Sequence, residues 1–241
     1  MSADFRIEHV DRLDCVIEDF HWRLASENAA QVAERWAAEV ALKPKMFDGR
    51  VLMAHRAVIE ERGQERVFAS SFFETSYSSF RFNQLRGFSD PDAINCFAMA
   101  ALRSSDGAFL LGEMGPHTAN AGQIYSPAGT PDLEDVVGTK VDLEGSVLRE
   151  LEEETGLGPE DVRVAPGSIL IFRGQQIACM RVLDLSTDAI AAEARMTNWL
   201  AAQDQPELTR MHIIRDGADT KLARMPVFMA AFMRYMLRKP A

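Results

Sequence analysis

The segment 142–156 constrains the fold most, because it predicts a short helix with two different faces. Asp142 is a typical N-cap residue, and Gly156 is a typical glycine stop at the C-terminal end. Three aliphatic side chains recur every fourth residue on this helix: Leu143, Val147 and Leu151. Because residues four apart share one face, this stripe predicts packing against a sheet. We therefore expect an α/β protein in which the sheet fixes the helix.

Carboxylates occupy the adjoining face of the same helix. Glu150, Glu153 and Glu154 stand at i, i+3 and i+4, so they project from one side. Three like charges there are costly without a counter-ion. Arg149 reaches Glu153 at i+4 or neutralises the cluster from its flank. Hard oxygen ligands favour Mg²⁺ or Mn²⁺, and the pattern predicts such a site.

The nine residues 149–157 match the pattern Arg-Glu-U-x-Glu-Glu-x-Gly-U, in which U is a bulky aliphatic residue. A chance match is on the order of one in a million per starting position. The expected strands 94–103 and 109–112 and the turn 125–129 precede the pattern. Residues 94–183 thus resemble the Nudix hydrolase family.

This resemblance implies an α/β/α sandwich with a mixed sheet and an N-terminal α/β extension. It implies that Arg149, Glu150, Glu153 and Glu154 are catalytic, and that the three glutamates hold the metal with a carbonyl near Gly129. The metal would activate water against a diphosphate linkage. The general base stays open among four acids: Asp184, Asp188, Glu193 and Glu207.

Two positions depart from the family's pattern. Val141 replaces its upstream glutamate, and Asp135 replaces its glycine. An insertion within Thr130–Lys140 explains the altered spacing, with Gly138 or Gly129 taking the glycine's part. Three acids are candidates for the missing carboxylate: Glu134, Asp142 and Glu144.

The chain divides into an N-terminal α/β lobe, residues 1–90, and a hydrolase domain, residues 91–241, at the turn-rich segment 87–91. Further elements are expected as follows: one or two helices over 19–40, a hairpin of 51–60 and 66–73, a Gly-rich loop over 115–122, strands within 162–183, a helix over 188–201, a strand over 211–214 and a final helix from Pro226 to Arg238. For Phe228 and its neighbours in the final helix, core packing is favoured over a homodimer face or a membrane-surface helix.

Substrate-binding candidates lie mainly in the N-terminal lobe. The segments 43–50 and 75–81 resemble the corresponding lobe of Nudix enzymes that hydrolyse UDP-sugars, and the Pro-Ala-Gly turn resembles ADP-ribose and nucleotide-sugar pyrophosphatases. Lys45, Arg50 and Arg81 would contact phosphate or ribose, although ordinary surface charge is the competing interpretation. His117 and Asn120 are further candidates in the 115–122 loop.

Charge and cysteine usage exclude several classes of protein. A net charge of −10 argues against a nucleic-acid polymer as partner. Three isolated cysteines, an acidic N-terminus and the lack of a long apolar run predict a cytoplasmic protein that does not enter membranes.

The expected activity is hydrolysis of a nucleoside diphosphate derivative, an NDP-sugar or ADP-ribose, to a nucleoside monophosphate and a phosphorylated product. A nucleotide-sensing module that no longer cleaves, and a nucleoside triphosphate pyrophosphatase, are the alternatives.

Overall fold

The computed structural model describes residues 5–118 and 120–238. Its helices are α1 (Arg23–Glu27), α2 (Ala29–Leu42), α3 (Tyr77–Leu85), α4 (Leu143–Thr155), α5 (Ala189–Ala201) and α6 (Val227–Met236), with short 3₁₀ turns η1 (Leu133–Asp135), η2 (Pro159–Asp161) and η3 (Thr220–Arg224). Its strands are β1 (Arg6–Val10), β2 (Arg12–Ile17), β3 (Arg50–Arg62), β4 (Glu65–Ser76), β5 (Asn95–Arg103), β6 (Phe109–Met114), β7 (Ile124–Tyr125), β8 (Val136–Val137), β9 (Lys140–Val141), β10 (Val162–Val164), β11 (Ser168–Arg173), β12 (Gln176–Leu185) and β13 (Leu208–Ile214).

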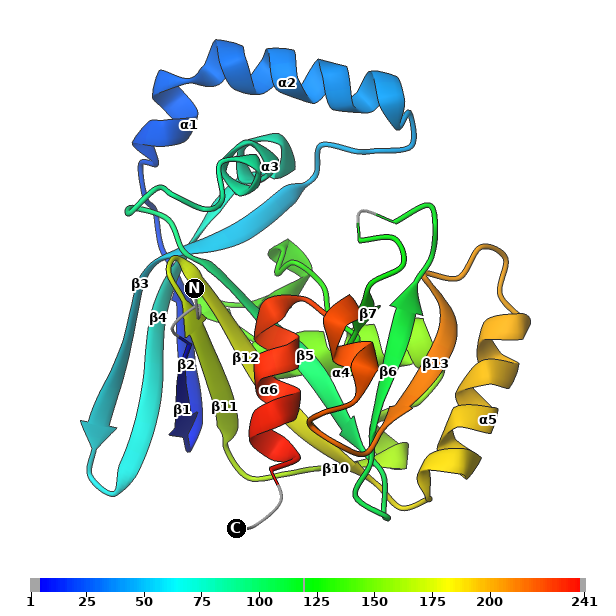
Figure 1. The fold of residues 1–241 in the computed structure, drawn as a ribbon. Helices are drawn as coiled ribbons and strands as arrows, with labels where there is room; N and C mark the ends of the chain where they lie inside the picture. Colours follow the sequence, from blue (N-terminus) through cyan, green and yellow to red (C-terminus); the bar gives the residue numbers. More distant parts are fainter. Residues whose placement is uncertain (1–4, 119, 239–241) are drawn as a thin grey trace.

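The larger sheet is the centre of the molecule. Its strand order is β1-β11-β12-β5-β6-β13, with β10 paired to β12 and β7 paired to β6. The β12–β5 pair is parallel and the other pairs are antiparallel, so the sheet is mixed. Helix α6 lies over one face, and α4 lies behind the sheet (Figure 1).

Alternate residues of β5 supply the two cores. Phe97 and Met99 pack with α6, whereas Ala98 and Ala100 pack with α4 and α5. This alternation follows from the two-residue repeat of a strand. The predicted α/β/α sandwich with a mixed sheet is confirmed.

The smaller sheet has the order β3-β4-β2-β9-β8. Its long β3–β4 hairpin confirms the one predicted from the sequence, and Gly63 takes a positive φ of 68° in the turn. Helices α1, α2 and α3 lie above the hairpin and the larger sheet (Figure 1). Strand pairs link the two predicted lobes, because β1 pairs with β11 and β2 with β9. The division at residue 90 stays a prediction.

Helix α4 forms as its sequence predicts. Asp142 caps it by accepting a hydrogen bond from the Gly145 N–H at 2.9 Å. Gly156 ends it with a left-handed φ of 69°, and the Trp199 ring lies where a Cβ would project. The apolar stripe is buried against the sheet: Leu143, Val147 and Leu151. Each such side chain contributes roughly 1.5–3 kcal/mol when buried.

Other predicted elements have mixed outcomes. The final helix packs in the core, with Phe228, Phe232 and Met233 buried, as expected. The inserted segment forms the β8–β9 hairpin. Helix α3 was not expected from the sequence. No helix within the described ranges is long and apolar enough to cross a membrane.

Candidate functional site

Glu150 and Glu154 form the centre of the candidate site. Both belong to α4, where a separation of four residues puts them on one face. Glu154 is buried, and its carboxylate accepts a hydrogen bond from the Ala128 N–H at 3.4 Å. The Glu150 side chain is only 15% exposed. The apolar stripe of α4 thus holds two carboxylates below the surface.

Gly129 allows the turn after β7 to approach these carboxylates. A Cβ at this position would lie 2.2 Å from Glu150 Oε1, well inside van der Waals contact. Only glycine permits this close approach without displacing the carboxylate. The backbone of residue 129 therefore lies beside Glu150, as the resemblance implies for a carbonyl ligand.

Burial changes the protonation of both glutamates. It raises the pKa of Glu150 to about 7, against an opposing effect of Arg149. It also raises the pKa of Glu154 well above its usual range, and the charges of Glu207 and Glu150 add to the effect. A buried and a half-buried carboxylate near a third acid are costly unless cations balance their charge. This donor set, rich in hard oxygen ligands, fits Mg²⁺ or Mn²⁺.

Arg149 is held by an acid that the sequence pattern did not indicate. Its Nη2 lies 2.9 Å from Asp135 Oδ1, and the Asp135 side chain is 2% exposed. The pKa of Arg149 is raised, chiefly by this hydrogen bond. Nη1 lies 3.2 Å from Glu150 Oε1 and 3.7 Å from Glu153 Oε1. Asp135 thus fixes the arginine beside the carboxylates from the position where the family's pattern has glycine.

None of the three acids considered as replacements for the missing upstream carboxylate is described beside the cluster. Asp142 caps α4, and Glu144 pairs with Arg181 at 3.1 Å. Glu134 is exposed. Gly138, a candidate for the glycine's part, has a φ of 65° between β8 and β9. The one signal for Asp135 in the sequence was its place within the inserted segment.

Glu153 is the outermost member of the cluster. Its side chain is 60% exposed and lies on the Arg149 side. Among residues 5–118 and 120–238, no three His, Cys, Asp or Glu side chains meet closely enough to hold an ion as they stand. Glu150 and Glu154 are therefore brought together, with Glu153 at the rim.

Of the four acids considered as general base, Glu207 is the one whose charge acts on both Glu150 and Glu154. It precedes β13, and its carbonyl accepts a hydrogen bond from the Gly115 N–H at 2.7 Å. Asp188 instead caps α5, and Glu193 is half-buried on that helix.

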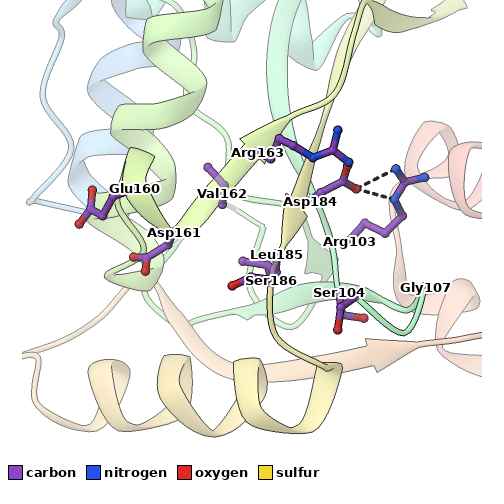
Figure 2. A pocket seen from close by; sticks show the side chains of 11 residues that line it. Arg103, Ser104, Gly107, Glu160, Asp161, Val162, Arg163, Asp184, Leu185 and Ser186 are labelled. Atoms are coloured by element: carbon purple, nitrogen blue, oxygen red, sulfur yellow. Dashed lines mark hydrogen bonds and ion pairs between the residues drawn. The ribbon is translucent and has the colours of Figure 1, made fainter.

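Asp184 lies at the other end of the sheet, in a polar hollow (Figure 2). Arg103 and Arg163 both donate to it, at 2.7 and 2.6 Å. Since β5 runs from Asn95 to Arg103, this hollow is roughly 26 Å from the strand's first residue at about 3.3 Å per residue. Asn95, the first residue of β5, lines the same pocket as Glu154, so Asp184 is remote from the carboxylate cluster.

A pocket of about 160 Å³ opens beside Glu154 and the turn at Ala128 and Gly129. Its other residues come from both predicted lobes, and α3 supplies Tyr77, Phe80, Arg81 and Gln84. Arg81, a predicted substrate-binding residue, is thus brought to the same pocket as Glu154. Tyr77 and Phe80 belong to the segment 75–81 that was singled out in the sequence, but neither they nor Gln84 were predicted as binding residues, because α3 was not expected. The local signal for this helix is Ser76, an N-cap whose side chain accepts from the Ser79 N–H.

The remaining two basic candidates lie elsewhere. Arg50 Nε donates to Glu74 Oε1 at 2.5 Å and faces a separate hollow that Glu18 also lines. Lys45 is exposed, and its Nζ donates to Gln205 at 3.2 Å. The structure does not bring either residue to Glu154.

No family model matches the chain, and no curated protein is significantly similar to it. Similar solved structures include a Deinococcus radiodurans protein (16% identity, TM-score 0.42), covering 62% of this chain and 89% of that one. A Nudix hydrolase from M. smegmatis has 16% identity and a TM-score of 0.39, covering 58% and 81%. The Nudix domain of Shewanella oneidensis NrtR, solved with ADP-ribose, has 20% identity and a TM-score of 0.38, covering 64% and 95%. At this level of superposition the matches do not identify an activity.

Proposed function

We propose that this protein is a Nudix-type hydrolase that cleaves the diphosphate of a nucleoside diphosphate derivative, an NDP-sugar or ADP-ribose. One observation carries the proposal: buried Glu154 and half-buried Glu150 lie beside the glycine turn, and Glu154 lines a pocket that also contains Arg81. Arg149 contacts both Asp135 and Glu150, so one basic side chain faces these two acids while Glu154 is buried close by. A structural role alone gives no reason for this excess of negative charge.

Glu150, Glu153 and Glu154, with the carbonyl of Gly129, would hold Mg²⁺ or Mn²⁺. When bound, such an ion neutralises phosphate charge and lowers the pKa of attacking water. Arg149, fixed by Asp135, orients the carboxylates of Glu150 and Glu153.

We assign Glu207 as the acceptor of the water proton, because its charge reaches both buried glutamates. The water oxygen forms a bond to one phosphorus, and the bond from that phosphorus to the bridging oxygen breaks. The bridging oxygen leaves on the other phosphate, so a nucleoside monophosphate and a phosphorylated product result.

The test is a hydrolysis panel of NDP-sugars, ADP-ribose and dNTPs with Mg²⁺ or Mn²⁺, with products separated by chromatography. Glu150→Gln, Glu153→Gln and Glu154→Gln should each lower turnover at least about 100-fold, since the loss of one group that stabilises the transition state costs 2.7–4 kcal/mol in comparable cases. Glu152→Gln is the matched control, because Glu152 is exposed on the same helix. Wild-type rates in all three variants would refute the mechanism.

A second candidate is a nucleotide-binding module without hydrolysis. The observation that favours it is Arg149, which lies between Glu150 and Glu153 and neutralises part of the cluster. Tight nucleotide binding without any product across the panel would support this function instead. Release of pyrophosphate from dNTPs would identify a triphosphate pyrophosphatase.

A further inference from the structure

Two hollows adjoin each other on the side of the molecule where Glu154 lies. The inner hollow is the pocket of about 160 Å³ beside Glu154, and the outer hollow, of about 360 Å³, lies between α2 and α3. Tyr77 and Arg81 line both, so the two share a wall. Arg81 is fixed there by Glu39, whose Oε2 accepts from Nε at 3.1 Å and from Nη2 at 2.9 Å. The two hollows therefore meet at Tyr77 and Arg81, with Glu154 on the inner side and α2 on the outer side.

The inner hollow is too small to hold a whole nucleotide. Sites for small organic ligands usually have volumes of about 300–1,000 Å³. The inner hollow is below that range and the outer hollow lies within it. A substrate that reacts beside Glu154 must therefore extend either into the outer hollow or into solvent.

The inner hollow has the chemistry of a site for a sugar. Amide side chains line it on several elements: Gln84, Asn95, Asn120 and Gln176. Amides both donate and accept hydrogen bonds, as ribose hydroxyls require. Aromatic rings, among them Phe97 and Tyr125, complete its walls.

The outer hollow suits a flat, largely apolar group. Its walls include the aliphatic side chains of Leu42, Met46 and Leu85 and the aromatic ring of Tyr77. Leu42 is 84% exposed and Leu85 is 47% exposed, so both offer apolar surface to a ligand. Basic side chains also line the hollow: Arg35, Lys43, Arg81 and His117. Glu39, which pairs with Arg81, lines it too. Apolar walls with a few polar groups are typical of pockets for small organic ligands.

The Gly-rich loop after β6 contributes a residue to each of the two hollows. It contributes Asn120 to the inner hollow and His117 to the outer one. Its two ends are fixed, because the Gly115 N–H donates to the Glu207 carbonyl at 2.7 Å and Arg224 donates to the Gly122 carbonyl at 2.9 Å. Figure 1 shows this loop rising towards α2 and α3. Residues of both predicted lobes thus line the two hollows.

We propose that the outer hollow between α2 and α3 binds the nucleobase of the substrate, while the inner hollow holds the ribose of the same nucleotide. The phosphate attached to that ribose then lies beside Glu154, and the group beyond the second phosphate points away from both hollows. This inference rests on the proposed function and adds the direction in which the substrate binds. It makes α2 and α3 the determinants of base preference.

The test measures equilibrium binding to the full chain by titration calorimetry with Mg²⁺. The probes are AMP, GMP, CMP, UMP and ribose 5-phosphate, of which the last lacks a base. At least one nucleotide should bind about tenfold or more tightly than ribose 5-phosphate. Equal affinities for all five probes, or no binding by any nucleotide, would overturn the proposal.

Two exposed leucines on opposite walls provide the variant. Leu42→Gln with Leu85→Gln removes apolar contact without adding charge, and it should weaken the best nucleotide about fivefold while leaving ribose 5-phosphate unchanged. Ile190→Gln is the matched control, because Ile190 is 68% exposed on α5 and lies outside both hollows. Unchanged nucleotide affinity in the double variant would overturn the proposal.

Kinetics separates this inference from the proposed function. The double variant should raise KM for the accepted substrate about fivefold with little change in kcat, because the base is remote from the reacting phosphorus. A wild-type chain that hydrolyses no diphosphate would contradict the proposed function, while the calorimetric result would still decide where a nucleotide binds.

Discussion

Replacement of Asp135 by asparagine tests how the Arg149 side chain is held. Asp135 is nearly fully buried, and its two oxygens contact Arg149 Nη2 at 2.9 Å and the Asp132 N–H at 3.1 Å. Breaking a buried ion pair costs roughly 3–5 kcal/mol. The Arg149 side chain is 32% exposed and retains Glu150 as a partner, so water and Glu150 offset part of this loss. We expect Asp135→Asn to lower the free energy of unfolding by about 2 kcal/mol.

The measurement is urea unfolding followed by circular dichroism at pH 7, together with the midpoint of thermal unfolding. For a chain of 241 residues, about 2 kcal/mol corresponds to a fall in Tm of about 4–8 °C. Glu134→Gln is the control, since this neighbouring acid is exposed. If the free energy of unfolding of Asp135→Asn is within about 0.5 kcal/mol of that of the control, Asp135 does not hold Arg149. Asp135 would then not compensate for the altered upstream half of the sequence pattern.

Two further changes probe the glycine turn and the smaller sheet. Gly129→Ala should lower turnover at least about tenfold, because the added Cβ displaces the Glu150 carboxylate. The urea midpoint should not change, since the atom displaced is the flexible end of a side chain. Full activity in this variant would exclude the close approach of the residue 129 backbone to Glu150. Hydrogen bonds from Lys140 and then Arg62 lower the pKa of Asp14 to about 2 from an ordinary value of 3.8. This pairing stabilises the fold above pH 3.8, and the stabilisation is lost as the pH falls towards 2. Between pH 5 and 2 the wild type should therefore lose about 1 kcal/mol more stability than Asp14→Asn, measured by urea unfolding, and parallel losses would contradict this.

Helix α4 was predictable because its signals are local. Asp142, the stripe at every fourth residue and Gly156 act within one segment, and the carboxylates follow from helical spacing alone. By contrast, the segment 70–85 is rich in Phe and also contains Tyr77, residue types that favour strand, and its first part does form the end of β4. The helix that follows, α3, depends on packing under α2, which no local pattern reveals.

Long-range pairing was the other information missing from the sequence. β1 and β2 are consecutive, yet β1 pairs with β11 and β2 with β4. Register of this kind depends on tertiary contacts. The site shows the same dependence on tertiary contacts. Asp135 contacts Arg149, and the charge of Glu207 acts on Glu150 and Glu154, only because the fold brings these residues together. Their separation along the chain does not predict these contacts.

Metal binding at Glu150 and Glu154 can be measured without any substrate, because a bound cation offsets the repulsion between these acids and so stabilises the folded state. A ligand that binds only the folded state stabilises it by about 2.7 kcal/mol at 100 times its Kd. For a chain of this length that corresponds to a rise in Tm of roughly 5–11 °C. Mg²⁺ should produce such a rise in the wild type and in Glu152→Gln, and EDTA should reverse it. Glu154→Gln should show little response, because it removes the negative charge of the most buried carboxylate of the cluster. An equal rise in Glu154→Gln would show that the ion binds elsewhere, and the buried pair would then need another explanation.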